Sequence, residues 1–296
     1  MTVPIAGPHP SPKRPNLPTP ALGCDCHAHT FGPSDRFPYT EGRGYTPPDA
    51  PVEAYLAMLD TLGLTRGICV QGNAHGFDNR AILDAAARHP CRLRAVGITD
   101  TVPATTLHDW HAQGMRGLRF HLYYRDDKPG YKRGVGLDVL EYFAPTMQEL
   151  GWHAQIWLDW RALPELAPVL RRVAERMPVV IDHMLNIDAS AGVGHPSFQT
   201  LLRLVAEGAC WVKLSGAYRV SADYPDYPDA RPFHEALVRA NPDQLVWGTD
   251  WPHPQIDAAK MPDDGHLLDL FNAWTSDPAL RRKILAENPA RLYFAG

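Results

Sequence analysis

Eight short apolar segments recur along the chain, and each is followed by a segment with a helical pattern. Short, nearly continuous apolar runs are typical of parallel strands that are buried on both faces. The predicted strands are residues 22–27, 67–71, 93–98, 117–121, 153–158, 179–183, 210–214 and 245–248. Eight strand–helix units predict an α/β protein with a (β/α)8 TIM barrel, and a doubly wound open sheet is the alternative architecture.

The segments between the predicted strands carry apolar residues at helical spacing. The predicted helices are residues 51–62, 78–89, 105–113, 137–150, 163–177, 197–207, 232–240 and, in pieces, 264–287. Pro145, Pro164 and Pro168 are expected to end or kink the helices that contain them. The 296 residues fit one barrel domain, because barrels of this class use about 250 residues or more as a single unit.

The first twenty residues are rich in proline and lack the apolar stretch of a signal peptide. We expect residues 1–20 to form an extended arm and residues 21–296 to form the barrel. The net charge is −4, and no lysine- or arginine-rich run occurs, which argues against a nucleic-acid or membrane-surface protein. No run of 18 apolar residues is present to span a membrane.

The five cysteines are an odd number without paired spacing, which favours reduced thiols in a cytoplasmic protein. The sequence leaves open whether the protein is a monomer or a homo-oligomer.

Polar residues gather where three predicted strands end. His27 and His29 close the first strand, His183 closes the sixth, and Asp250 follows the eighth. Residues two apart on a strand point to the same side, and active residues of a barrel lie at the carboxyl ends of its strands. Each feature alone is a weak signal, but together they predict one site that contains three imidazoles and a carboxylate.

Several longer motifs point to a known family. DCHAHTFGP, VVIDH, LVWGTDWPHP and NPARLYF resemble motifs of the amidohydrolase superfamily, in its "amidohydrolase 2" branch. FGPSDRFPYTEGRGYTPPDAPVE, VQGNAHGFDN, GLRFHLYYR and GTDWPHPQ resemble the 2-pyrone-4,6-dicarboxylate lactonases and related lactone hydrolases of that branch. The resemblance covers nearly all of the chain after the arm, and it is more specific for the branch than for the substrate.

The resemblance implies roles for individual residues. Asp250 is the implied general base, and His27, His29 and His183 are implied to polarise a lactone carbonyl. Arginines bind carboxylates through two parallel hydrogen bonds, and arginines of the matching motifs hold the substrate's carboxylates in the lactonases. The implied substrate-binding residues are Arg119, Arg125, Arg219, Tyr45, Asn73, His75, His121, Trp157 and His253. Asn73, His121 and Trp157 depart from the lactonase pattern, so the sequence does not determine which lactone ring the substrate contains.

In metal-dependent relatives the matching histidines bind zinc, and here His27, His29, His183 and Asp250 would be the ligands of a single zinc. The strand at 153–158 offers Gln155 and Trp157 where a further ligand is expected, and both are poor zinc ligands. We therefore expect hydrolysis of a small anionic lactone without a metal cofactor. A zinc-dependent decarboxylase of an aromatic or related carboxylic acid is the alternative, and a non-catalytic binding protein is a third hypothesis.

Overall fold

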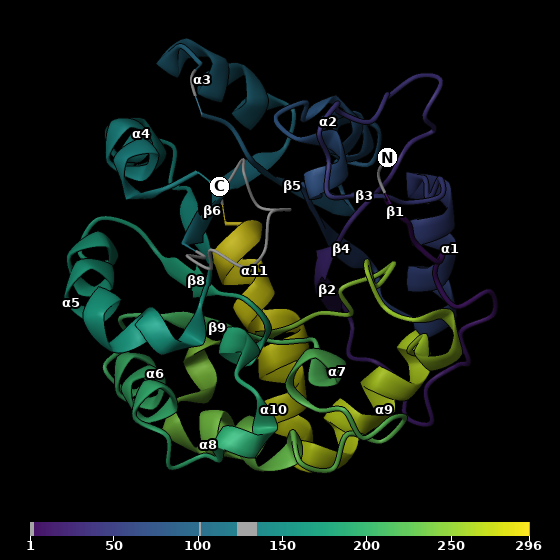
Figure 1. The fold of residues 1–296 in the computed structure, drawn as a ribbon, viewed down its shortest axis with the longest axis vertical. Coiled ribbons are helices and arrows are strands. Elements are labelled where there is room, and N and C mark those ends of the chain that lie inside the picture. The colour runs from purple at the N-terminus through teal and green to yellow at the C-terminus, as the bar shows by residue number, and fades with distance from the viewer. Residues whose placement is uncertain (1–2, 101, 123–134, 296) are drawn as a thin grey trace.

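The computed structural model describes residues 3–100, 102–122 and 135–295. An eight-stranded parallel sheet forms its centre, with helices arranged in a ring around it (Figure 1). The strands are β2 (Cys24–Ala28), β4 (Arg66–Val70), β5 (Leu93–Gly97), β6 (Met115–Leu122), β7 (His153–Leu158), β8 (Val179–Ile181), β9 (Trp211–Leu214) and β10 (Leu245–Trp247). All eight predicted strands are confirmed, with boundaries that differ by a few residues.

The strands pair in chain order from β2 to β10, so these two stand at the ends of the sheet. They meet just beyond their carboxyl ends, where Ala28 and Trp251 form a parallel bridge. The Asp250 amide donates to the His27 carbonyl at 2.8 Å, and the His29 amide donates to the Trp251 carbonyl at 2.7 Å. The sheet is therefore a nearly closed (β/α)8 barrel and not a doubly wound open sheet.

The helices follow the strands as predicted. They are α1 (Val52–Leu62), α2 (Arg80–Arg88), α3 (Ala104–Ala112), α4 (Leu137–Glu149), α5 (Leu163–Ala174), α6 (Pro196–Ala206), α7 (Ala217–Val220), α8 (Arg231–Ala240), α9 (Asp264–Trp274), α10 (Pro278–Arg282) and α11 (Asn288–Tyr293). Pro145 and Pro168 lie inside α4 and α5, which continue through them. Pro164 occupies the first turn of α5, where its missing N–H costs nothing.

The last helix closes the amino-terminal end of the barrel. Leu292 and Tyr293 of α11 pack with inward-facing apolar side chains from β2, β4, β5, β8, β9 and β10. Phe294 lies under the guanidinium groups of Arg66 and Arg94, which stand near the starts of β4 and β5. Figure 1 shows α11 in yellow near the middle of the ring. This end of the barrel is therefore filled by apolar side chains, and the polar strand ends lie at the opposite end.

The proline-rich N-terminal segment lies against the barrel. Strand β1 (Val3–Pro4) pairs in parallel with β3 (Tyr45–Thr46). The Lys13 amide donates to the Asp263 carboxylate at 3.0 Å, and the Asn16 amide donates to the Asp269 carboxylate at 2.6 Å. The division of the chain at residue 20 stays a prediction. Over the ranges that the structure describes, no helix has both the length and the apolar character needed to cross a bilayer.

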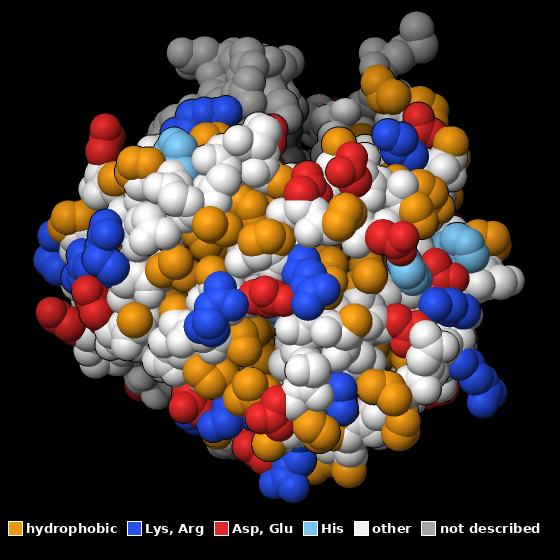
Figure 2. All heavy atoms as spheres, turned by 90° about the horizontal axis from the view of Figure 1, so that it is seen from below, with side chains coloured by type: hydrophobic (Ala, Val, Ile, Leu, Met, Phe, Trp, Pro, Cys, Tyr) orange, Lys and Arg blue, Asp and Glu red, His pale blue; other side chains and the backbone are white. Residues whose placement is uncertain are grey.

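The surface charges are mixed on the face seen in Figure 2. Acidic and basic side chains alternate there with apolar and neutral ones. This face therefore carries no broad field of one sign of the kind that attracts a polyanion.

Candidate active site

A cavity opens at the carboxyl ends of the barrel strands. Its lining residues are His29, Tyr45, Gly72, Asn73, Arg119, His121, Trp157, His183, Arg219, Asp250, Pro254 and Gln255. All of these except Gly72, Pro254 and Gln255 were predicted from the sequence as site residues. The sequence analysis did not predict these three residues. Each lies next to or shortly after a predicted site residue in the chain, but none has a catalytic or charged side chain that would have indicated a role.

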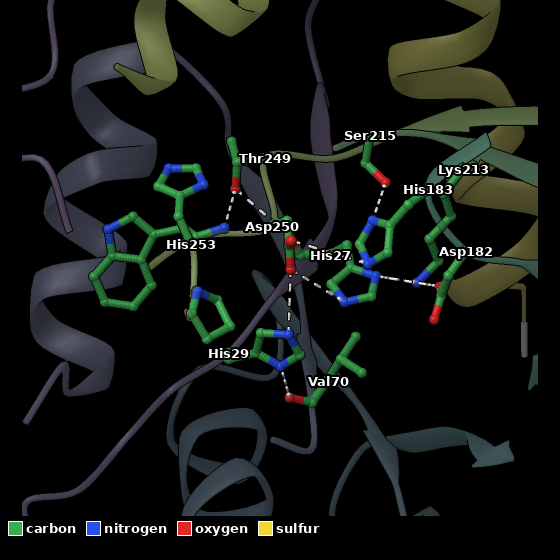
Figure 3. A network of polar contacts seen from close by, with 12 residues as sticks. His27, His29, Val70, Asp182, His183, Lys213, Ser215, Thr249, Asp250 and His253 are labelled. Carbon is green, nitrogen blue, oxygen red and sulfur yellow. Dashed lines mark hydrogen bonds and ion pairs between the residues drawn. The ribbon is translucent and has the colours of Figure 1, made fainter. Parts of the chain in front are cut away.

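Asp250 stands at the centre of the predicted catalytic set (Figure 3). The His29 Nε2 atom lies 3.3 Å from the Asp250 Oδ1 atom, and the His27 Nε2 atom lies 3.7 Å from the same oxygen. The His183 Nε2 atom lies 3.9 Å from the other carboxylate oxygen, Oδ2. The ends of β2, β8 and β10 thus bring the three imidazoles around one buried carboxylate, as the sequence predicted.

The carboxylate of Asp250 is held in its ionised form. Its Oδ2 atom accepts hydrogen bonds from Arg219 Nε and from the Tyr218 hydroxyl, both at 2.7 Å. Burial by itself raises the pKa of Asp250, but the Arg219 guanidinium and the neighbouring imidazoles together outweigh it and hold the pKa well below its usual value. Asp250 is therefore ionised.

Two of the histidines beside Asp250, His183 and His27, are kept neutral. Burial lowers the pKa of His183 to about 4. Burial, with the Lys213 ammonium next to it, also lowers the pKa of His27 well below its usual value. A neutral imidazole has one donor and one acceptor nitrogen, so the role of each ring depends on which nitrogen carries the hydrogen.

The neighbours of His29 and His27 bear on where that hydrogen sits. His29 Nδ1 lies 2.9 Å from the Val70 carbonyl, which only accepts, so Nδ1 carries a hydrogen and Nε2 faces Asp250. His27 Nδ1 lies 3.3 Å from both Lys213 Nζ, a donor, and Asp182 Oδ1, an acceptor, so these contacts fit either tautomer of His27.

A second buried carboxylate, Asp182, supports this group, and the sequence analysis assigned it no role. Arg119 donates to Asp182 Oδ2 through Nε at 3.0 Å and through Nη2 at 2.9 Å. Gln155 donates to the same oxygen at 3.1 Å, and Lys213 donates to Gln155 Oε1 at 2.7 Å. Asp182 and Lys213 each interrupt an otherwise apolar strand segment, and that interruption was the available signal.

The turn that carries Asp250 is anchored by Asp25 of β2. The Asp25 carboxylate accepts from the Thr249 amide at 2.9 Å and from the Thr249 hydroxyl at 2.7 Å. Burial raises the pKa of Asp25 to about 6. Asp250 itself has a φ of 65°, a left-handed conformation that costs a residue other than glycine about 1–3 kcal/mol. The Asp25–Thr249 contacts help to hold this conformation.

Three predicted site residues do not line the cavity within the described part of the chain. His27 is fully buried beneath Asp250. His75 is buried between the Gly32 amide, at 3.3 Å, and the Pro38 carbonyl, at 3.4 Å. His253 is buried behind Asp250, with Tyr218 and Asp264 at its two ring nitrogens. Arg125 lies outside the described residues.

The donor atoms could hold a single metal ion. The ligand atoms of His27, His29 and Asp250 lie within 4.8 Å of one another, and so do those of His27, Asp182 and His183. His27 Nε2 and Asp250 Oδ1 are buried and make no hydrogen bond to the described residues. Imidazole and carboxylate are ordinary zinc ligands, so the first set fits a zinc ion in both chemistry and spacing.

Comparison with known proteins shows the family. The amidohydrolase family matches residues 24–295, and the chain belongs to this family. It is 40% identical over 272 residues to the 4-sulfomuconolactone hydrolase of Rhizobium radiobacter, covering 91% of this chain and 89% of that protein. It is 36% identical to the 2-pyrone-4,6-dicarboxylate hydrolase of Comamonas testosteroni, covering 96% of this chain and 94% of that protein.

Solved structures support the same fold. A crystal structure of an Agrobacterium tumefaciens protein without ligand has a TM-score of 0.82 and 29% identity, covering 95% of this chain and 99% of that one. More distant structures share the fold alone: a zinc-bound amidohydrolase from Burkholderia multivorans is 21% identical, and a 2,6-dihydroxybenzoate decarboxylase is 15% identical. The decarboxylase alternative therefore has only a fold-level likeness behind it.

Proposed function

We propose that the protein hydrolyses a small anionic lactone with Asp250 as the general base. The observation that carries this proposal is an ionised, buried carboxylate among neutral imidazoles, in a cavity whose wall also bears Arg119 and Arg219. The names of the relatives support it, because the sulfonated lactone and the pyrone dicarboxylate that they act on are both anionic. The catalytic group is Asp250, His27, His29 and His183.

The attacking water donates a hydrogen to Asp250 Oδ1, the carboxylate oxygen that faces His29 and the cavity. Asp250 takes the proton as the water oxygen bonds to the lactone carbonyl carbon. His29 lines the cavity beside this oxygen and helps to orient the water and the substrate.

The carbonyl oxygen becomes an oxyanion in this step and needs hydrogen-bond donors. His183 lines the cavity and can present Nε2–H to this oxygen when Ser215, 2.9 Å from its Nδ1, donates to the ring. Fixed donors of this kind stabilise the developing charge. His27 is buried beneath Asp250, with Nε2 3.7 Å from Asp250 Oδ1, and supports the base from there. The ring C–O bond then breaks, and the proton on Asp250 passes to the departing ring oxygen. The product is an open-chain carboxylic acid with a new hydroxyl or enol group, and the acid releases the second water proton to solvent as it becomes a carboxylate.

The substrate's anionic groups bind the arginines of the cavity wall. Arg219 and Arg119 reach the cavity from α7 and β6, and we retain Arg125 as a third candidate. Tyr45, Asn73, His121 and Trp157 line the remaining wall and would select the ring and its substituents.

We propose that this reaction needs no metal. A zinc ion held by His27, His29 and Asp250 would supply Lewis-acid polarisation of the carbonyl. However, β7 presents Gln155 and Trp157 where a further ligand would be expected, and an amide and an indole are poor zinc ligands. Gln155 instead bonds to Asp182 and Lys213. We also propose that the enzyme works in the cytoplasm, as a monomer or homo-oligomer.

A panel of anionic lactones and their neutral methyl esters tests the proposal. The wild-type protein should open at least one sulfonated or carboxylated lactone, and the loss of ultraviolet absorbance measures the rate of this reaction. Arg219→Met should lower kcat/KM more for the anionic lactone than for its neutral ester, by a factor equivalent to about 1.5–3 kcal/mol. Because the ester lacks the anion, its loss of kcat/KM measures only the effect of breaking the contact between Arg219 and Asp250. Failure of every lactone in the panel would refute the function, and equal losses for both substrates would refute the anion clamp.

A further inference from the structure

A chain of hydrogen-bonded side chains runs from Asp250 away from the cavity. The Tyr218 hydroxyl donates to Asp250 Oδ2 at 2.7 Å. His253 Nδ1 lies 2.9 Å from the Tyr218 oxygen, and His253 Nε2 lies 3.1 Å from Asp264 Oδ1. In the view of Figure 3, His253 and the pair of His27 and His183 lie on opposite sides of Asp250.

The three residues come from separate segments that meet behind the general base. Tyr218 lies on α7, His253 follows β10, and Asp264 begins α9. His253 has a φ of 59°, and its amide donates to the Asp250 carbonyl at 2.8 Å. This tight turn folds the chain back so that the His253 ring lies behind the carboxylate that precedes it. His253 and Asp264 are completely buried, and Tyr218 is partly buried.

The directions of the two hydrogen bonds nearest to Asp250 are fixed by its carboxylate. An ionised carboxylate only accepts, so the single hydrogen of the Tyr218 hydroxyl points to Asp250. The Tyr218 oxygen must then accept from His253, which places a hydrogen on Nδ1. Both donors therefore point toward the base.

We propose that Tyr218, His253 and Asp264 are positioning residues that fix the orientation of Asp250. They lock Oδ2 from behind and leave Oδ1 facing His29 and the cavity. Arg219 also holds Oδ2, but it lines the cavity where a substrate anion would compete for it, whereas Tyr218 is not among the residues that line this cavity. The hydroxyl of Tyr218 is then the contact that keeps the base oriented during turnover. This inference rests on the proposed role of Asp250 as the base.

Tyr218→Phe tests the inference, because it removes one hydroxyl and keeps the ring. The kcat for an anionic lactone should fall by about 10–100-fold while KM stays unchanged, since outer-shell partners of this kind act on the reactive group and not on substrate affinity. Asp264→Asn should keep most of the activity, because an amide can still donate to His253 Nε2. Tyr227→Phe is the matched control: its ring lies 6.3 Å from that of Tyr218, and its activity should equal that of the wild type.

A crystal structure of Tyr218→Phe supplies a readout that is independent of any substrate. We expect the Asp250 carboxylate to rotate about its Cβ–Cγ bond. Wild-type kcat together with an unrotated carboxylate would overturn the inference and leave lactone hydrolysis intact. If the wild-type protein opens no lactone, the proposed function fails, and the orientation of Asp250 in the variant still decides whether Tyr218 positions it.

Discussion

Arg219 Nε donates a hydrogen bond to Asp250 Oδ2 at 2.7 Å, so the predicted anion clamp and the predicted base form an ion pair. A guanidinium at this distance favours the ionised carboxylate and weakens it as a base. A substrate anion that draws Arg219 toward itself would return basicity to Asp250. In the proposed mechanism, this one side chain would couple substrate binding to proton transfer.

Replacing the base should abolish most turnover. Asp250→Asn keeps the shape of the side chain, and asparagine tolerates the left-handed φ of 65° at this position. An amide cannot take the proton of the attacking water, so kcat should fall by about 10²–10⁴-fold. Steady-state kinetics on an anionic lactone, with the circular dichroism spectrum as a check on folding, measures the effect. Wild-type turnover would place the base elsewhere, with His183 as the next candidate.

Breaking the buried pair of Arg119 and Asp182 should cost stability. Arg119→Met leaves Asp182 ionised and buried, which should lower the free energy of unfolding by about 3–5 kcal/mol. Arg119→Met combined with Asp182→Asn should cost less than the sum of the single variants, as urea denaturation would show. Arg171→Met is the control, because its partner Glu207 is exposed and such pairs contribute about 0–1 kcal/mol. Strict additivity in the double variant would contradict a coupled buried pair.

The protein should lose stability as the pH falls below neutrality. Burial lowers the pKa of His183 to about 4 and those of His121, His153 and His234 to about 3. Their unfolded-state pKa is about 6.5, so below this pH the unfolded chain binds protons that the folded state does not. The free energy of unfolding should therefore be at its full value above pH 6.5 and decrease from there to about pH 4, by up to about 1.4 kcal/mol per pH unit for each histidine.

A single-site variant checks the origin of this pH dependence. His234 bonds to Thr275 and lies away from the active-site cavity. Denaturation of His234→Gln across this pH range should show that the free energy of unfolding changes less steeply with pH than in the wild type, by about the contribution of one histidine. An unchanged slope would show that His234 is not neutral in the folded protein.

Removal of metal should leave most of the activity in place. Gln155 and Trp157 stand where a further zinc ligand would be expected, and the His183 N–H group can serve the oxyanion without a metal. Protein stripped with a chelator, with its metal content verified by elemental analysis, should retain most of its kcat. Loss of activity that zinc alone restores would assign His27, His29 and Asp250 to a metal and contradict the proposal.

The barrel and the place of its site could be predicted because they depend on local signals. Short apolar runs mark buried parallel strands wherever they occur, and the order of strand and helix leaves few topologies. The barrel then dictates that polar residues at strand ends, such as His29, His183 and Asp250, converge. The motifs that carry Arg119 and Arg219 could be found for the same reason, because the end of a strand can be predicted from its own residues without knowing their distant partners.

Only the tertiary structure decided which side chains touch. His253 lies in the same motif as Asp250, yet the left-handed turn between them places its ring behind the carboxylate and outside the cavity lining. Lys213 reaches His27 across the barrel, and Tyr218 reaches Asp250 from helix α7, over separations of 186 and 32 residues. Local periodicity fixes the direction in which a side chain leaves its own strand or helix. The partner that it meets depends on how distant segments pack, and no pattern within one segment contains that information.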